Sequence, residues 1–113
     1  MDFRDAPVDQ AELVRIRRQL HMYPETKWDL PRTTALVREE LERSGIFYEA
    51  DKYGPNTIVA TINPQIAAFT IALRADMDAL SVQELNDVPY KSTVDGVMHA
   101  CGHDGHTASL LGA

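Results

Sequence analysis

The sequence predicts a layered α/β fold, because its apolar pattern changes along the chain from helical to extended. Two early segments, 9–23 and 30–44, repeat apolar residues at the spacing of an α-helix. Further on, 67–73 is apolar almost throughout, as expected for a strand that is buried on both faces of a sheet. With 113 residues, 44% of them hydrophobic and 25% charged, the chain has the size and composition of one folded unit.

The segment 9–23 is predicted to be a helix with a marked start and end. Asp9 and Glu12 have the spacing of a capping box, in which each side chain accepts a hydrogen bond from the other residue's backbone N–H. Pro24 ends the helix, because the residue before a proline disfavours helical dihedral angles. We interpret His21 as buried and hydrogen-bonded. Three basic residues lie off the apolar stripe and are interpreted as a solvated face: Arg15, Arg17 and Arg18.

The segment 30–44 is predicted to be a second helix. Pro31 suits its first turn, where the missing N–H of proline costs no hydrogen bond. Gly45 can end the helix in a left-handed conformation. The helix therefore has a start and a stop signal at the ends of its apolar repeat.

Two short strands are predicted next, over 46–51 and 57–62, with a turn between them. After the apolar strand 67–73, the segment 75–103 is polar and has little periodicity. A connection of this length without regular structure is uncommon and is usually functional or binds a ligand. A third helix is predicted to begin near Asp104 or Gly105.

This third helix is still continuing at Ala113, without a cap, a basic last turn or a polar tail. We therefore expect residues 1–113 to be the front part of a longer protein. The acidic start of the chain lacks the apolar core of a secretory signal, and no apolar run approaches the ~20 residues of a membrane span.

Charge and cysteine usage exclude some functional classes. Lys and Arg number 11 against 17 Asp and Glu, which gives a net charge of −6. So acidic a chain is a poor candidate for binding the phosphate backbone of a nucleic acid. One cysteine cannot form an internal disulfide, so we expect a reducing, cytoplasmic location.

Histidine and cysteine cluster in a short part of the polar segment. Four of the five histidine and cysteine residues of the chain fall within residues 99–106: His99, Cys101, His103 and His106. Thiolate and imidazole ligands together suit transition metals such as Zn, Co, Ni, Fe or Mn. In an extended chain, residues two apart point the same way, so Cys101 and His103 can reach one metal ion.

The cluster also allows three other interpretations. A structural zinc site would use four ligands, typically in pairs of the C-x-x-C kind, and Cys-x-His fits that pattern poorly. A catalytic pair of Cys101 with His103 or His106 is conceivable, but such partners usually come from separate elements. Isolated histidines and cysteines are also often simple packing or surface residues.

Two carboxylates form a second feature. Asp76 and Asp78 follow the apolar strand 67–73, and open α/β sheets bind ligands beyond the carboxyl ends of their strands. Carboxylates there could ligate a metal, orient a ligating histidine or assist a base. The alternative is that they cap loops or pair with Arg74.

Three segments together resemble a known family. They are Arg17–His21 with Pro24-Glu25, Ala72–Leu80, and Gly96–Thr107. In this order and spacing they are similar to the amino-terminal part of the metal-dependent amidohydrolases and aminoacylases. That group includes hippurate hydrolase, N-acetyldiaminopimelate deacetylase and the indoleacetyl-amino-acid hydrolases, a branch of the carboxypeptidase-like metallopeptidases. Ser81 and Thr26-Lys27 depart from the family pattern but touch no expected ligand.

The resemblance implies a three-layer αβα catalytic domain of the zinc-exopeptidase type, of which residues 1–113 would be the amino-terminal portion. It implies hydrolysis of an N-acyl amino acid or a related small amide by water activated at two divalent ions, such as Zn, Mn, Co or Ni. Cys101 and His103 would be metal ligands, and Asp78 would support a metal-bound histidine or the base. Three residues would be supporting groups or further ligands: Asp76, Asp104 and His106.

The partner would then be a small-molecule substrate, with no nucleic acid or membrane involved, and a homodimer is one assembly that this allows. A different hypothesis is a truncated, catalytically incompetent product that binds metal or associates with a partner. A third is a cysteine hydrolase, which predicts sensitivity to thiol reagents that persists in the presence of a chelator.

Overall fold

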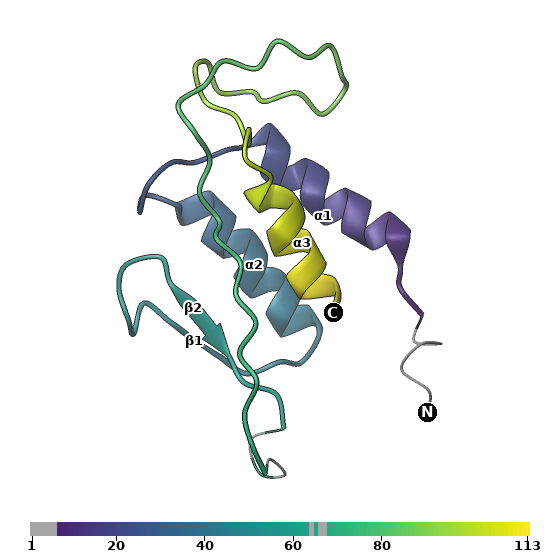
Figure 1. Cartoon of the computed structure of the whole chain (residues 1–113), viewed down its shortest axis with the longest axis vertical. Helices are drawn as coiled ribbons and strands as arrows, with labels where there is room; N and C mark the ends of the chain where they lie inside the picture. Colours follow the sequence, from purple (N-terminus) through teal and green to yellow (C-terminus); the bar gives the residue numbers. More distant parts are fainter. Residues whose placement is uncertain (1–6, 64, 66–67) are drawn as a thin grey trace.

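The computed structural model describes residues 7–63, 65 and 68–113. It contains three helices and a two-stranded sheet (Figure 1). In chain order these elements are α1 (Gln10–Met22), α2 (Pro31–Arg43), β1 (Tyr48–Ala50), β2 (Ile58–Ala60) and α3 (His103–Gly112). The three predicted helices are therefore confirmed, each within one or two residues of the expected start.

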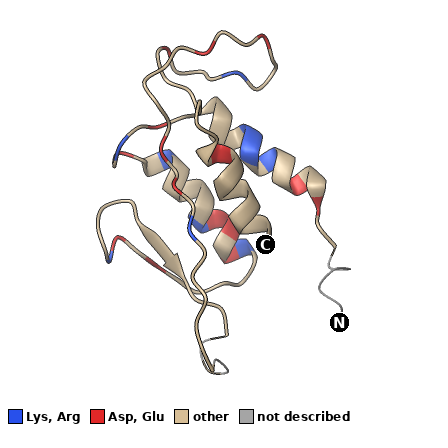
Figure 2. Ribbon diagram, in the orientation of Figure 1, with Lys and Arg blue, Asp and Glu red and all other residues tan. Residues whose placement is uncertain are grey.

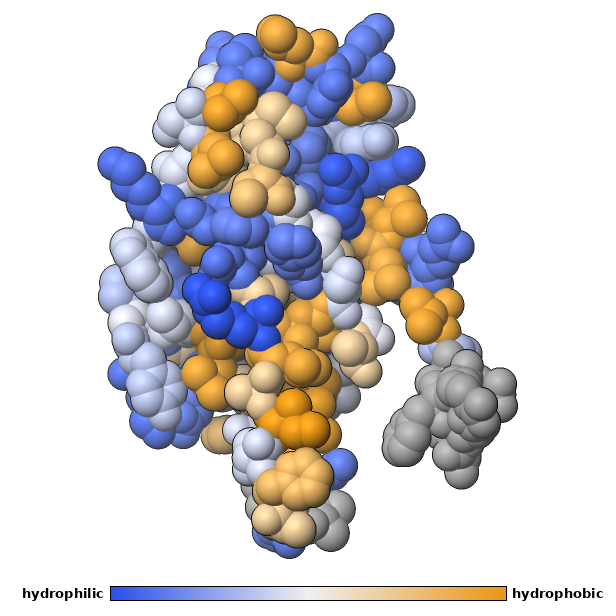
Figure 3. Space-filling view, viewed as in Figure 1, coloured by the Kyte–Doolittle hydropathy of each residue, from blue (hydrophilic) through white to orange (hydrophobic). Residues whose placement is uncertain are grey.

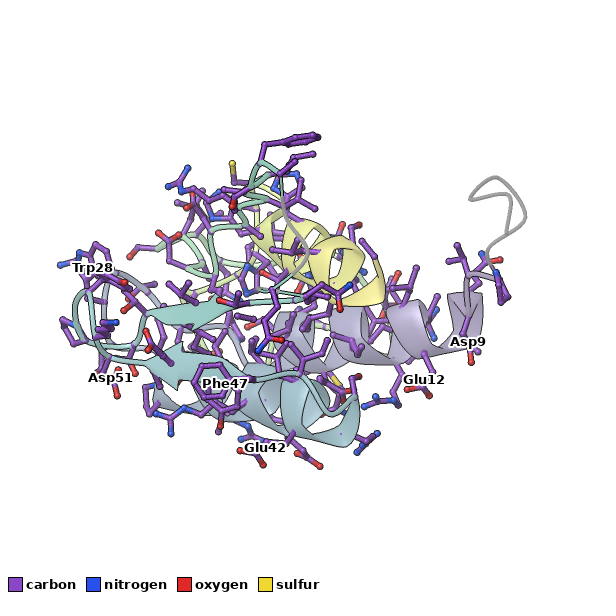
Figure 4. The ribbon with its side chains drawn as sticks, turned by 90° about the horizontal axis from the view of Figure 1, so that it is seen from below. Asp9, Glu12, Trp28, Glu42, Phe47 and Asp51 are labelled. Carbon is purple, nitrogen blue, oxygen red and sulfur yellow. The ribbon has the colours of Figure 1, made fainter. Side chains whose placement is uncertain are left out.

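The start of α1 contains half of the predicted capping box. The Asp9 carboxylate accepts a hydrogen bond from the backbone N–H of Glu12 at 3.2 Å. The Glu12 side chain does not reach back and instead pairs with Arg15 at 2.7 Å. Figure 4 labels Asp9 and Glu12 close together at this end of α1. One N–H of the first turn is therefore satisfied by Asp9, as expected of an N-cap residue.

The hydrophobic core lies where α1 packs against α3. Ile16, Leu20 and Ala108 form a buried cluster, and Leu36 of α2 and Leu111 pack against it. In Figure 1, α3 lies between α1 and α2, so segments about 90 residues apart in the sequence form one helical layer. The start of α3 is thereby fixed relative to both other helices.

A side chain from outside α2 caps its first turn. Leu30, the N-cap residue, supplies no side-chain hydrogen bond. The Glu25 carboxylate accepts instead from the backbone N–H of Thr33 at 2.6 Å and from that of Arg32 at 3.2 Å. A negative charge is also favourable there because the positive end of the helix dipole lies at its N-terminus.

Glu25→Ala is expected to lower the free energy of unfolding by about 1 kcal/mol, the usual cost of a lost N-terminal cap. Urea unfolding of the intact protein followed by circular dichroism measures this. Glu39→Ala, at an exposed position of the same helix, is the matched control and should change stability by less than about 0.5 kcal/mol. Equal losses in the two variants would show that Glu25 does not act as a cap.

The two predicted short strands are confirmed, although each is shorter than expected. β1 and β2 pair antiparallel, with Glu49 opposite Val59. At the end of this hairpin the Asn56 side chain donates to the backbone carbonyl of Trp28 at 2.5 Å, and its N–H donates to Asp51 at 2.6 Å. Trp28 and Asp51 lie at the same end of the molecule in Figure 4, so the hairpin is tied to the α1–α2 connection.

The third predicted strand, 67–73, is not a strand in the structure. Residue 67 lies outside the described residues, and 68–73 has no regular secondary structure. Its large apolar side chains are exposed, by 76% at Phe69 and 73% at Ile71. The prediction is wrong because a strand needs a hydrogen-bonded neighbour, and β1 and β2 are the only strands in the described part of the chain. Figure 3 shows several hydrophobic groups at the surface on the viewed face.

Charged side chains are spread over α1, α2 and the loops, whereas α3 has a single charged residue, Asp104, near its start (Figure 2). Within the described ranges, no helix has both the length and the apolar character required to cross a membrane. The low charge of α3 fits its place between the other two helices.

Candidate metal centre

The segment that carries Asp76 and Asp78 is held in place by backbone hydrogen bonds. The N–H of Ala79 donates to the carbonyl of Glu25 at 2.7 Å, beside an isolated parallel bridge between Ala79 and Thr26. Leu80 and Met98 exchange two backbone hydrogen bonds, of 3.0 and 3.1 Å. These contacts place the two aspartates beside the residues that lead into α3.

A glycine turns the chain into α3. Gly102 has φ +99°, a value that residues with a side chain rarely adopt. A Cβ atom there would meet the His106 ring at 3.8 Å, an ordinary contact, so the backbone angle and not space requires glycine. The turn makes His103 the first residue of α3, with the backbone N–H of His106 donating to the Gly102 carbonyl at 3.0 Å.

The structure brings His103 and Asp78 together. Nδ1 of His103 lies 2.9 Å from the backbone carbonyl of Asp78 and 3.0 Å from its carboxylate. Both of these oxygens are acceptors, so Nδ1 carries the proton and donates to them. Nε2 is thereby left as the ring nitrogen for a metal ion, which is the arrangement that a metal-binding histidine usually has. The His103 side chain is 19% exposed.

Asp76 lies on the other side of the same ring. Its carboxylate is 3.9 Å from Nε2 of His103, while the second oxygen pairs with Arg74 at 2.5 Å. Metal–nitrogen and metal–oxygen bonds are about 2 Å long, so two ligands of one ion can be as much as ~4 Å apart. The residues present therefore fit a shared cation between Asp76 and His103. The pairing with Arg74 that we considered for Asp76 is also present.

The remaining predicted ligands do not join this pair. Cys101 is a free, exposed cysteine, and His106 is exposed with its ring centroid 5.9 Å from that of His103. Among the residues that the structure describes, no group of three or more His, Cys, Asp or Glu side chains is close enough to hold an ion. The structure thus brings His103 close to Asp76 and Asp78, and the shared ion at Cys101 and His103 stays a prediction.

His99, which we placed in the cluster but gave no role, is buried with only 5% of its surface exposed. Neither ring nitrogen has a hydrogen-bond partner among the described residues. Burial lowers the pKa of His99 and so favours the neutral ring. An unpaired buried nitrogen is costly and is typical of a site that receives an ion, a water molecule or a ligand. This observation also fits a metal site nearby.

Asp104 lies in a separate, buried group of polar side chains. It is 2% exposed, and its carboxylate pairs with Nδ1 of His21 at 2.7 Å and with Nε of Arg17 at 2.9 Å. Nε2 of His21 lies 3.0 Å from both carboxylate oxygens of Glu84. The interpretation of His21 as a buried, hydrogen-bonded histidine is confirmed.

Two features of this group were missed from the sequence. Glu84 is 1% exposed but lies in the polar stretch 75–103, where no periodicity distinguishes buried from exposed residues. Arg17 was assigned to a solvated face, and that assignment is wrong. It binds Asp104 and lies 5.2 Å from the centre of the Tyr90 ring, because the 80–98 loop covers this side of α1.

Comparisons with known proteins agree with the motifs. Residues 72–113 match peptidase family M20/M25/M40. The chain is 47% identical over 100 residues to thermostable carboxypeptidase 1 of Saccharolobus solfataricus (88% of this chain, 25% of the relative), and 46% identical over 103 residues to hippurate hydrolase of Campylobacter jejuni (90% and 26%). A crystal structure of the Bacillus subtilis YXEP protein, described as a dinuclear metal-binding peptidase of the M20 family, superposes with a TM-score of 0.84 at 40% identity. Over these stretches the chain is similar to peptidases of the M20 family.

The match to the M20 structure confirms the predicted fold class. The superposition covers 89% of this chain and 28% of the YXEP protein. The chain spans about a quarter of the length of the curated relatives that it matches. Its helices and small sheet therefore correspond to one portion of an α/β peptidase domain.

The pKa of Glu84 is strongly shifted. Burial alone would raise it, but hydrogen bonds from the Ser92 N–H, His21 and Asn86 outweigh burial and lower the pKa to about 2 from 4.5. A carboxylate whose pKa is lower in the folded state stabilises the fold above its unfolded pKa. That contribution is lost as the pH falls from about 4.5 through 2.

We therefore expect the free energy of unfolding to fall by an amount on the order of 3 kcal/mol between pH 6 and pH 2, over and above the losses from other groups. Urea unfolding of the wild type and of Glu84→Gln across this range measures the effect. The stability difference between the two proteins should shrink as the pH falls, because glutamine does not titrate. A constant difference would contradict the assignment.

Proposed function

We propose that this chain is the amino-terminal part of the catalytic domain of a metal-dependent amidohydrolase that cleaves the amide bond of N-acyl amino acids. The single observation that carries the proposal is the arrangement of His103, with Nδ1 held by Asp78 and Nε2 free toward Asp76. The relation to hippurate hydrolase and to a carboxypeptidase supports amide hydrolysis as the reaction class. The substrate would be a small molecule.

Each site residue has a proposed role. His103 and Cys101 would hold divalent metal, as imidazole and thiolate suit Zn, Mn, Co or Ni. The dinuclear description of the YXEP protein supports two ions. Asp76 is a further candidate ligand, because its carboxylate faces the same ring nitrogen. Asp104 would support the site from its buried position. His106 would be a further supporting group, and its ring lies 5.9 Å from that of His103.

When bound, the metal ions would supply activated water and polarise the carbonyl of the scissile amide. Asp78 accepts the Nδ1 proton of His103, which fixes the tautomer and the direction of the ring and makes Nε2 more basic. Arg74 pairs with one oxygen of Asp76 and leaves the other directed toward His103. These contacts hold the donor atoms in place before any ligand arrives, which lowers the entropic cost of binding.

Metal removal tests this function. The intact protein is dialysed against a chelator, and the release of glycine from N-benzoylglycine and of amino acids from N-acetyl amino acids is measured. Activity is expected to disappear and to return when Mn²⁺, Co²⁺ or Zn²⁺ is added. A short peptide with a free carboxyl terminus serves as the comparison substrate, since a preference for it would indicate a carboxypeptidase.

A thiol reagent provides the control for the cysteine-hydrolase alternative. Hydrolysis that persists in the chelator and is abolished by the reagent would assign the reaction to a Cys101 nucleophile and would reject the metal mechanism. If metal protects Cys101 from the reagent, the thiolate is a ligand.

A further inference from the structure

His21 occupies an unusual position between two carboxylates. It lies in the last turn of α1 and is 3% exposed. Nδ1 faces Asp104 at 2.7 Å and Nε2 faces Glu84 at 3.0 Å. An ionised carboxylate can only accept hydrogen bonds, so both ring nitrogens donate and the ring is an imidazolium cation between two anions. The proposed chemistry gives this ring no role.

Each of the two carboxylates organises a different piece of backbone. Asp104 accepts from the N–H of Gly105 at 2.9 Å, in the first turn of α3. Glu84 accepts from the N–H of Ser92 at 2.7 Å and from the Asn86 side chain at 3.1 Å, within the 80–98 loop. One imidazolium ring thus joins α1, the loop and the start of α3.

These two pieces of backbone lie on either side of the segment 99–103. At one end, the loop closes through the paired backbone hydrogen bonds of Leu80 and Met98. At the other end, Asp104 follows His103 directly. Buried, charge-assisted hydrogen bonds are short and directional, so they fix the groups that they join more firmly than apolar contacts do.

We infer that His21 is a positioning residue that fixes both ends of the segment 99–103, and thereby the placement of Cys101 and His103. The inference rests on the proposed function, because metal binding is the reason why Cys101 and His103 need to be held in place. The effect of His21 on the position of these two residues does not itself depend on metal. His21 acts through Asp104 at the start of α3 and through Glu84 in the 80–98 loop.

Two conservative variants separate the contact of His21 with Asp104 from its contact with Glu84. In His21→Asn the amide nitrogen takes the place of Nδ1, so the bond to Asp104 is kept and the bond to Glu84 is lost. In His21→Gln the amide nitrogen takes the place of Nε2, so the bond to Glu84 is kept and the bond to Asp104 is lost. If His21 only stabilised the fold in general, the two variants would behave alike. If it positions the loop through Glu84 and the start of α3 through Asp104, each variant loosens one of these two segments and spares the other.

Amide hydrogen exchange of the metal-free, intact protein reads out these effects. His21→Asn is expected to accelerate exchange at the Ser92 amide by about tenfold or more and to spare Gly105; His21→Gln is expected to do the reverse. Leu20→Ala, a cavity in the neighbouring core, is the control and should not separate the two amides. Equal acceleration of both amides in the Asn and Gln variants would overturn the inference.

Co²⁺ titration, followed by the thiolate-to-cobalt absorption band, gives the second readout. His21→Gln, which releases the start of α3 next to His103, is expected to weaken Co²⁺ binding about tenfold, and more than His21→Asn does. Binding that is equally tight in both variants would refute the coupling to the metal ligands. A wild-type protein without the band would refute thiolate ligation in the proposed function, while the exchange pattern would still decide the role of His21.

Discussion

Replacing His103 with alanine is expected to lower the affinity of the intact protein for Co²⁺ by about 100-fold or more. The imidazole is the one predicted ligand that the structure shows already oriented, with Nδ1 bound to Asp78 and Nε2 free. Losing a ligand should cost at least as much as losing one of its supporting groups, whose loss typically costs 10- to 100-fold. Isothermal titration calorimetry with Co²⁺ measures the change.

Asp78→Ala provides a graded comparison. The backbone carbonyl of Asp78 also accepts from Nδ1 of His103, at 2.9 Å, and this bond survives the substitution. We therefore expect a loss near the lower limit for a supporting group, about tenfold. Asp87→Ala, at an exposed position of the 80–98 loop, should leave the affinity unchanged. An affinity in His103→Ala equal to that of the wild type would show that Nε2 does not bind the ion.

The helices could be predicted because their signals are local. The capping interaction of Asp9 lies within three residues, and the left-handed Gly45 follows the last turn of α2 directly. Interactions over such short distances act in nearly the same way in any context. The apolar segment 68–73 could not be predicted in this way. A strand forms only when its backbone is hydrogen-bonded to a neighbouring strand, and the sequence of the segment itself does not show whether such a strand is present.

Only part of the candidate site could be predicted from the sequence. Cys101 and His103 are predicted as ligands because chemically distinctive residues lie close together in the sequence, and the structure shows the contact of His103 with Asp78, which joins two of the predicted motifs. The bonds of His21 to Glu84 and Asp104 span 63 and 83 residues. Glutamates and aspartates are common on surfaces, so nothing in the local sequence distinguishes these two as buried.

The second large effect is expected at Glu84. Glu84→Ala should lower the free energy of unfolding by about 3–5 kcal/mol, because it leaves a buried imidazolium without one of its two counter-ions. It also leaves the backbone N–H of Ser92 without its acceptor. A loss of this size is a large share of the 5–15 kcal/mol that stabilises a typical domain.

Urea unfolding of the intact protein tests this loss, with Asp87→Ala as the control, since it removes an exposed carboxylate from the same loop and should cost less than about 0.5 kcal/mol. Glu84→Gln should fall between the two, because its amide oxygen can still accept a hydrogen bond from His21 but carries no charge. A ranking in which the glutamine variant is as unstable as the alanine variant would show that the charge of Glu84, and not its hydrogen bonds, holds the loop to α1. If all three variants were equally stable, the buried pair of His21 and Glu84 would contribute nothing to the fold.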